Sequence, residues 1–133
     1  MKKKTNSITH PVEPTKSELE ILQVLWKYGP STVRFVNEKL NAETRPVQYT
    51  TTLKLMQIMA DKSILLRDET HMKHIYKPAM EESKTKSFLL DKFIESMYEG
   101  SASGMMMQLL GNKKTSKKEI LAIKDLLKKW EGK

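Results

Sequence analysis

The fold is decided by residues 48–62, which read QYTTTLKLMQIMADK. Their core-forming positions recur with the three- and four-residue spacing of one helix face, so we predict a helix over residues 48–61. That buried face is formed by Thr52, Leu55, Met56 and Met59. The opposite face carries hydrogen-bonding side chains and is almost free of acid: Thr50, Thr51, Lys54 and Gln57. An ordinary solvated face usually mixes acids with bases, whereas an acid-free face suits a helix in the major groove of DNA, where phosphates repel carboxylates.

Two further helices are predicted upstream of this segment. Thr15 and Glu18 form a T-x-x-E capping box that begins a helix, and Gly29-Pro30 ends it. Its inward face is predicted to hold Leu19, Leu22 and Trp26, with Leu25 beside them. A second helix is expected over residues 33–41, capped by Thr32, with Val33, Val36 and Leu40 facing inward.

A short β-hairpin is predicted downstream. Two apolar runs, residues 64–66 and 72–77, surround the polar turn of residues 67–71, and Pro78 closes the second run. Three helices followed by a hairpin is the order of a winged helix. The expected fold is therefore mainly α with a small β-hairpin, in which the third helix enters a DNA groove and the hairpin contacts the backbone.

From residue 79 the sequence shows helix signals only. Helices are expected over residues 80–98 and 105–110, with a break from Gly100 to Gly104, and a last helix follows a capping box of Ser116 and Glu119. Three short helices expose more apolar surface than they can bury among themselves, which predicts a second copy of the chain as the partner. The alternative is a tail that folds back on its own head. The expected dimer contacts are Phe88, Phe93, Met97, Met106, Leu110, Ile123, Leu127 and Trp130.

Composition narrows the class of protein further. A net charge of +8 favours a polyanionic partner such as nucleic acid, although a basic protein without such a partner has the same composition. The absence of cysteine excludes disulfides and thiolate metal sites. No apolar run is long enough to span a bilayer, and the basic start at residues 1–4 lacks the apolar stretch of a signal peptide, so a cytoplasmic protein is expected. We predict a basic arm over residues 1–14, a DNA-binding domain over 15–78 and a dimerisation domain over 79–133.

The sequence resembles the penicillinase-repressor family of the BlaI/MecI type. The resemblance rests on residues 48–62, on the segment ELEILQVLW (18–26) with Gly29-Pro30, on HIYKP (74–78), and on tail positions such as Ser87-Phe88 and Gly100. It covers about residues 15–130 and implies a winged-helix repressor that binds a dyad-symmetric operator as a homodimer. It also implies DNA contacts by Tyr49, Thr50, Thr51 and Lys54, with Gln57 on the same face, and wing contacts by Arg67, Lys73 and His74. The family name points to β-lactam-resistance genes, although regulators of this architecture also control other genes.

Three residues depart from the family pattern. Ser63 stands where a glycine usually ends the third helix in a left-handed conformation, so a strained or altered turn is expected. Ile58 replaces a polar residue that could contact phosphate, and Thr52 replaces an apolar core residue. Some family members are cleaved at an asparagine–phenylalanine pair once a membrane sensor protease is triggered, and residues 105–111 contain no such pair.

Other functions are less well supported by the sequence. A winged helix can serve as a protein-docking module, but the face that would dock is polar and acid-free. No catalytic triad, carboxylate pair or phosphate-binding glycine loop is visible, so no enzyme is expected. His71 and His74 lack acidic or cysteine company, so neither a metal nor a cofactor is expected. The methionines of residues 105–107 could line a ligand pocket, although such a cluster more often belongs to a core.

Overall fold

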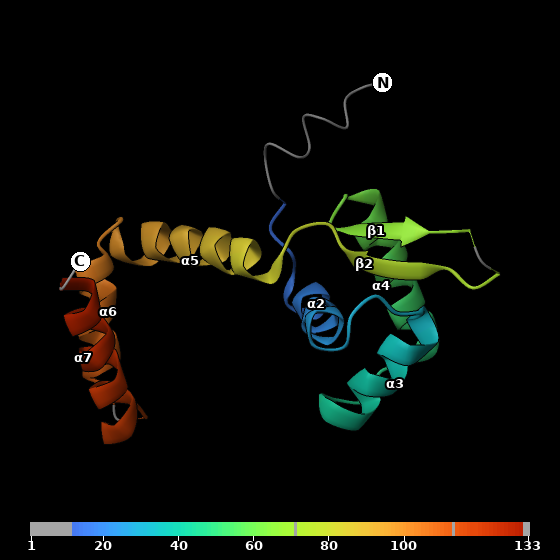
Figure 1. Ribbon diagram of the computed structural model, residues 1–133. Helices are drawn as coiled ribbons and strands as arrows, with labels where there is room; N and C mark the ends of the chain where they lie inside the picture. The colour runs from blue at the N-terminus through green and yellow to red at the C-terminus, as the bar shows by residue number, and fades with distance from the viewer. Residues whose placement is uncertain (1–11, 71, 113, 132–133) are drawn as a thin grey trace. The chain divides into compact units, whose positions relative to one another are not determined.

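A computed structural model describes residues 12–70, 72–112 and 114–131. Its described residues form six helices and a two-stranded sheet, and they fall into two compact units (Figure 1). The first unit, called the head, ends at Phe88, and the second, called the tail, begins at Leu89. The predicted arm lies largely outside the described residues.

The first two helices of the head begin where local signals place them, and α3 continues two residues beyond its predicted end at residue 41. Helix α2 (Lys16–Tyr28) starts with the predicted capping box: Glu18 N–H donates to Thr15 Oγ1 at 3.2 Å, and Thr15 N–H donates to Glu18 Oε1 at 2.9 Å. It ends at Gly29, whose φ of +90° is in a region that favours glycine. In α3 (Val33–Glu43), the Thr32 hydroxyl accepts a hydrogen bond from Phe35 N–H at 3.2 Å. The capping predictions are confirmed for both helices.

The third helix and the hairpin complete a winged helix. Helix α4 (Tyr49–Asp61) is followed by β1 (Leu65–Asp68) and β2 (Ile75–Pro78), which pair antiparallel with Leu65 opposite Pro78 and Asp68 opposite Ile75. The segment between α2 and α3 adds a single bridge, because Ser31 and Tyr76 exchange backbone hydrogen bonds of 2.8 and 3.0 Å. The hairpin packs beside α4 and α2 (Figure 1). The predicted fold class is confirmed.

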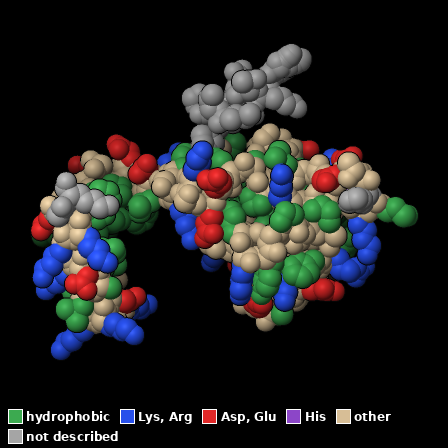
Figure 2. Space-filling view, in the orientation of Figure 1, with side chains coloured by type: hydrophobic (Ala, Val, Ile, Leu, Met, Phe, Trp, Pro, Cys, Tyr) green, Lys and Arg blue, Asp and Glu red, His purple; other side chains and the backbone are tan. Residues whose placement is uncertain are grey.

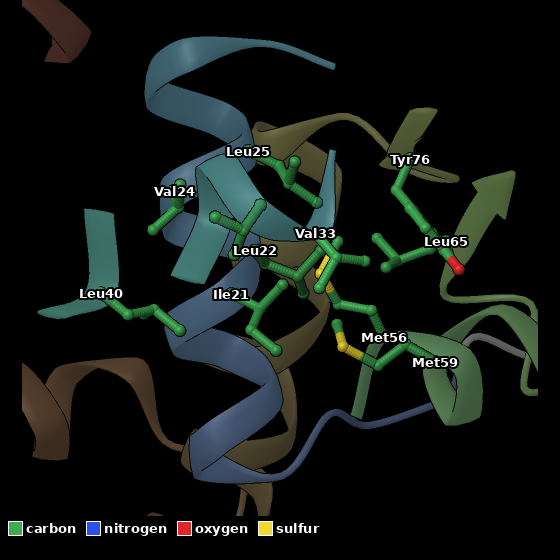
Figure 3. Close-up of a cluster of buried hydrophobic side chains, with 11 residues drawn as sticks. Ile21, Leu22, Val24, Leu25, Val33, Leu40, Met56, Met59, Leu65 and Tyr76 are labelled. Carbon is green, nitrogen blue, oxygen red and sulfur yellow. The ribbon is translucent and has the colours of Figure 1, made fainter. Parts of the chain in front are cut away.

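The core of the head lies where α2, α3, α4 and the hairpin meet (Figure 3). The inward face of α2 differs from the prediction: Ile21 is fully buried, whereas Leu19 and Trp26 are only partly buried at the edge of the core. The reason is that the buried stripe of α2 starts with a carboxylate, Glu18, which a search for apolar periodicity passes over. The buried core residues are Ile21, Leu22, Val24, Leu25, Val33, Val36, Leu40, Met56, Met59, Leu65 and Tyr76.

An exposed cluster joins the end of α2 to α3. The Tyr28 hydroxyl donates to the Glu43 carboxylate, and Lys39 Nζ lies 4.6 Å from the centroid of the Tyr28 ring. The hydrogen bond from Tyr28, supported by Lys27, lowers the pKa of Glu43. These contacts hold the far end of α3 against α2, which fixes the direction in which α3 leads into α4.

The turn after α4 keeps the geometry of a glycine turn although it holds a serine. Ser63 has a φ of +64°, and the hydrogen bonds from Ser63 N–H to Ala60 O (3.0 Å) and from Ile64 N–H to Met59 O (2.8 Å) form a Schellman motif. The strained conformation expected at this departure from the family pattern is therefore present, and the entry into β1 is preserved.

We predict that Ser63→Gly stabilises the head. A left-handed residue with a Cβ costs about 1–2 kcal/mol, and the extra freedom of glycine in the unfolded chain offsets part of this. The expected net gain is about 0.5–1 kcal/mol, or roughly 2–6 °C in the melting temperature. Thermal unfolding followed by circular dichroism measures it. Ser63→Ala is the control, because alanine keeps the Cβ; equal melting temperatures for the two variants would contradict the prediction.

The tail region is helical, as predicted, with one correction. Helix α5 (Glu82–Tyr98) runs from the head into the tail, and α6 (Ala102–Leu110) and α7 (Lys117–Glu131) follow. The break is shorter than predicted: Ser101 caps α6 by accepting from Gly104 N–H, so Gly104 lies inside the helix. Positive φ values at Glu99 and Gly100 make the turn. The Ser116–Glu119 capping box at α7 is present as predicted.

Candidate nucleic-acid interface

Helix α4 exposes the polar face that its sequence predicts. Thr52, Met56 and Met59 are fully buried on one side, so the helix cannot rotate without losing its core contacts. The other side is exposed, and its one carboxylate is that of Asp61 at the last position of the helix; the other exposed polar side chains are Tyr49, Thr50, Thr51, Lys54 and Gln57. Such a face offers donors and acceptors that can meet base edges or phosphates.

Two asparagines on α3 fix the position of this helix. Asn37 Nδ2 donates to Thr52 Oγ1 at 2.9 Å and to Val47 O at 3.0 Å. Asn41 also donates to Val47 O, and its Oδ1 accepts from Val47 N–H at 3.1 Å. The threonine at position 52 is therefore explained: its hydroxyl is buried but paired, and it links α3 to α4.

A surface hollow lies between the start of α3, helix α4 and the hairpin. It brings together four of the predicted DNA-binding residues, which are Tyr49, Gln57, Lys73 and His74. Thr50, Thr51 and Lys54 are exposed on α4 but do not line the hollow. Figure 2 shows Lys and Arg side chains gathered below the outer end of the hairpin.

Arg34 also lines this hollow, although no pattern in the sequence marks it as a DNA contact. Its guanidinium carbon lies 5.5 Å from the centroid of the Tyr49 ring, within the range of a cation–π contact. Glu38 follows Arg34 by four residues on α3, and this spacing would suggest an ordinary surface ion pair between the two side chains. No local pattern could reveal that the side chain turns to Tyr49 instead, because the two residues belong to different helices.

Arg67 is placed apart from the other predicted contacts. It lies on β1, opposite Tyr76, and lines a separate surface hollow with Leu66 and Lys77. Its Nε lies 2.6 Å from Glu69 Oε2. Hydrogen bonding to Tyr76 raises the pKa of Arg67, and Glu69 adds to the effect. A guanidinium already held by a carboxylate is a weaker candidate for phosphate than Arg34 and Lys73, which form no ion pair with any acid that the structure describes.

The described residues contain no group of three or more histidines, cysteines or carboxylates close enough to hold a metal ion. His71 lies outside them, so the pairing of His71 with His74 stays untested. No helix within the described ranges is long and apolar enough to cross a membrane.

A three-helix head with a wing and a third helix whose exposed side chains are polar from Tyr49 to Gln57 defines a winged-helix DNA-binding protein. The chain matches the penicillinase repressor family over residues 14–129, and it belongs to that family. The match confirms the resemblance predicted from the sequence, and it makes the protein a DNA-binding transcriptional repressor and not an enzyme. No curated protein matches the sequence significantly.

Proposed function

We propose that this repressor binds a dyad-symmetric operator as a homodimer, with α4 of each head in the major groove. The observation that carries the proposal is the exposed polar face of α4, which has no acid from Tyr49 to Gln57, beside a hollow lined by cations. In this arrangement the two half-sites lie about one helical turn, or ~34 Å, or a multiple of it, apart. Repression follows when the bound dimer occupies a promoter.

Specific residues have distinct roles in this proposal. The hydroxyls of Thr50 and Thr51, and the amide of Gln57, meet base edges or phosphates, and Lys54 reaches a phosphate or a guanine acceptor pair. Lys73 and His74 contact the DNA backbone from the wing.

Ile58 is exposed on α4, at a position where the family pattern has a polar residue. Its apolar side chain can contact the methyl group of a thymine in the major groove.

The tail is the proposed dimerisation region. None of the described residues of α6 or α7 is buried, and several large apolar side chains of α5–α7 are well exposed. Exposed apolar surface on this scale marks an interaction site. Of the residues predicted for this role, Phe88, Met106 and Ile123 are half-buried, and the exposed ones are Phe93, Met97, Leu110, Leu127 and Trp130.

The regulated genes and the inducing signal follow from family membership only as proposals. Antibiotic-resistance genes of the β-lactamase type are the first candidates, with relief of repression through a membrane sensor protease. The repressor would act in the cytoplasm, where its operator is. Residues 105–111 lack the asparagine–phenylalanine pair, so any cleavage would occur at another sequence.

We predict that Lys54→Ala weakens operator binding at least tenfold, because each of the two subunits loses a contact to a guanine or a phosphate worth ~1–3 kcal/mol. The measurement is a titration of the protein against its own upstream intergenic DNA and against a scrambled duplex, at two salt concentrations. Lys84→Ala is the matched control: Lys84 is an exposed lysine of α5 that does not line the hollow. Wild-type binding should weaken steeply with salt, because phosphate contacts release counterions.

Equal and weak binding to both duplexes would overturn the proposal. Only charge-driven association would then remain, and a winged-helix module that docks on another protein would become the better explanation. The exposed side chain of Ile58 is the feature of α4 that would serve such docking.

A further inference from the structure

We infer that Arg34, which lies on α3 and outside the recognition helix, binds a DNA backbone phosphate and holds Tyr49 in position for operator binding. The inference rests on the proposed function. It adds a ligand site that bridges three elements: Arg34 from α3, Tyr49 from α4 and Lys73 from the wing.

The first argument is charge. No carboxylate lines the hollow, and its titratable side chains are those of Arg34, Lys73, His74, Tyr49 and Tyr76. Within the described ranges, no ion pair connects Arg34 or Lys73 to an acid, whereas Arg45, Lys62 and Arg67 all have carboxylate partners within 3.0 Å. The hollow therefore keeps uncompensated positive charge, which favours an anion from outside the protein.

The second argument is the chemistry of the guanidinium group. An arginine can stack on an aromatic ring and still offer its N–H groups to two oxygens of one phosphate. The contact with the Tyr49 ring, at 5.5 Å, restricts the Arg34 side chain before DNA arrives. Less conformational entropy is then lost on binding than for a freely moving arginine.

The third argument is the place of this contact. Tyr49 is the first residue of α4, so a phosphate held by Arg34 fixes the end of the recognition helix nearest the DNA backbone. Lys73 approaches the same hollow from the wing. Phosphate contacts set register without reading sequence, so loss of Arg34 should weaken binding to every duplex and reduce the accuracy with which α4 meets the operator.

The test compares variants in the full-length protein by fluorescence anisotropy, with operator and scrambled duplexes over a series of salt concentrations. Arg34→Ala should weaken binding to both duplexes at least tenfold and reduce the slope of log Kd against log salt by about 1.8, because each of the two subunits loses one phosphate contact worth about 0.9. Arg34→Lys should keep most of the slope but lose part of the affinity, because an ammonium group cannot bind bidentately. Lys84→Ala is the charge-matched control.

The role in positioning Tyr49 is tested by a double-mutant cycle. Tyr49→Ala should weaken operator binding more in the wild type than in Arg34→Ala, because the two residues act together. Tyr49→Phe keeps the ring and should keep this coupling. Arg34 is exposed, so all variants should have the melting temperature of the wild type within a few degrees.

The outcomes separate the inference from the proposed function. The inference is overturned if the slope of log Kd against log salt falls no more in Arg34→Ala than in Lys84→Ala. It is also overturned if the effects of the Arg34 and Tyr49 substitutions are additive. Neither outcome affects the proposed function, which depends on the preference for the operator over the scrambled duplex. If the wild type binds both duplexes equally, the proposed function fails, and the slope still decides whether Arg34 binds phosphate. No DNA binding at all would overturn both.

Discussion

Lys62→Met should destabilise the head by about 3 kcal/mol, a large share of the stability that a domain of this size has. Lys62 Nζ lies 2.7 Å from Glu18 Oε2, and the Glu18 side chain is only 2% exposed. Without Lys62, the buried carboxylate keeps only the backbone N–H of Thr15 as a hydrogen-bond donor among the described residues. The Lys62 side chain is 33% exposed, so the cost falls at the low end of the range for broken buried ion pairs.

Urea unfolding followed by circular dichroism measures this effect. Glu18→Gln should cost less than Lys62→Met, because an ammonium group that is one-third exposed can be hydrated. The double variant, Glu18→Gln with Lys62→Met, should recover most of the loss, since a neutral amide can still accept the Thr15 hydrogen bond. If the double variant is as unstable as Lys62→Met alone, the buried charge is not the cause.

This ion pair also shows why one part of the head could not be predicted from periodicity. Glu18 has two roles, as the capping partner of Thr15 and as the buried partner of Lys62. The capping role is local and is visible in the T-x-x-E pattern. The buried role depends on Lys62, which is 44 positions away in the sequence, and only the folded chain brings the two together. Apolar periodicity alone therefore predicts a buried face of α2 that includes Leu19 and Trp26 and leaves out Ile21.

The same distinction divides the candidate interface. The exposed face of α4 could be predicted because its periodicity and lack of acids are properties of one short segment. The hollow could not, because Arg34, Tyr49 and Lys73 come from three elements. Arg67 was selected as a cation on the wing, but its neighbour Glu69 already pairs with it. Contacts between residues that are close in the sequence can thus be predicted from it, whereas contacts between residues of different elements cannot, whatever the residue types.

The departures from the family pattern lead to a related conclusion. Thr52 and Ser63 both disagree with local expectation, yet each is accommodated by particular hydrogen bonds. Asn37 pairs the buried hydroxyl of Thr52, and the Schellman motif holds Ser63 at positive φ. In both cases hydrogen bonds from neighbouring residues accommodate the unusual side chain or backbone angle. They keep α4 and the hairpin in the arrangement of the family fold.

Leu127→Glu should break the proposed dimer and weaken operator binding at least a hundredfold. Leu127 is 51% exposed on α7, and Trp130, which lies on the same side of the helix one turn further on, is 74% exposed. If a second copy covers this face, a carboxylate there is buried without a partner, at a cost of several kcal/mol. Two linked heads bind one operator with an avidity about 10²–10⁴ above that of one head, and monomers lose this gain.

Sedimentation velocity gives the oligomeric state, and titration of full and half operators gives the affinities. Lys129→Gln is the matched control, because it changes the net charge by the same amount on the opposite side of α7. It should leave the dimer intact. The Leu127→Glu variant should sediment as a monomer yet bind a half-site like one wild-type head, since the head does not depend on α7 for its core. A dimeric Leu127→Glu variant with wild-type operator affinity would show that this face of α7 is not the dimer interface, and that the exposed apolar residues of α5 and α6 must supply it.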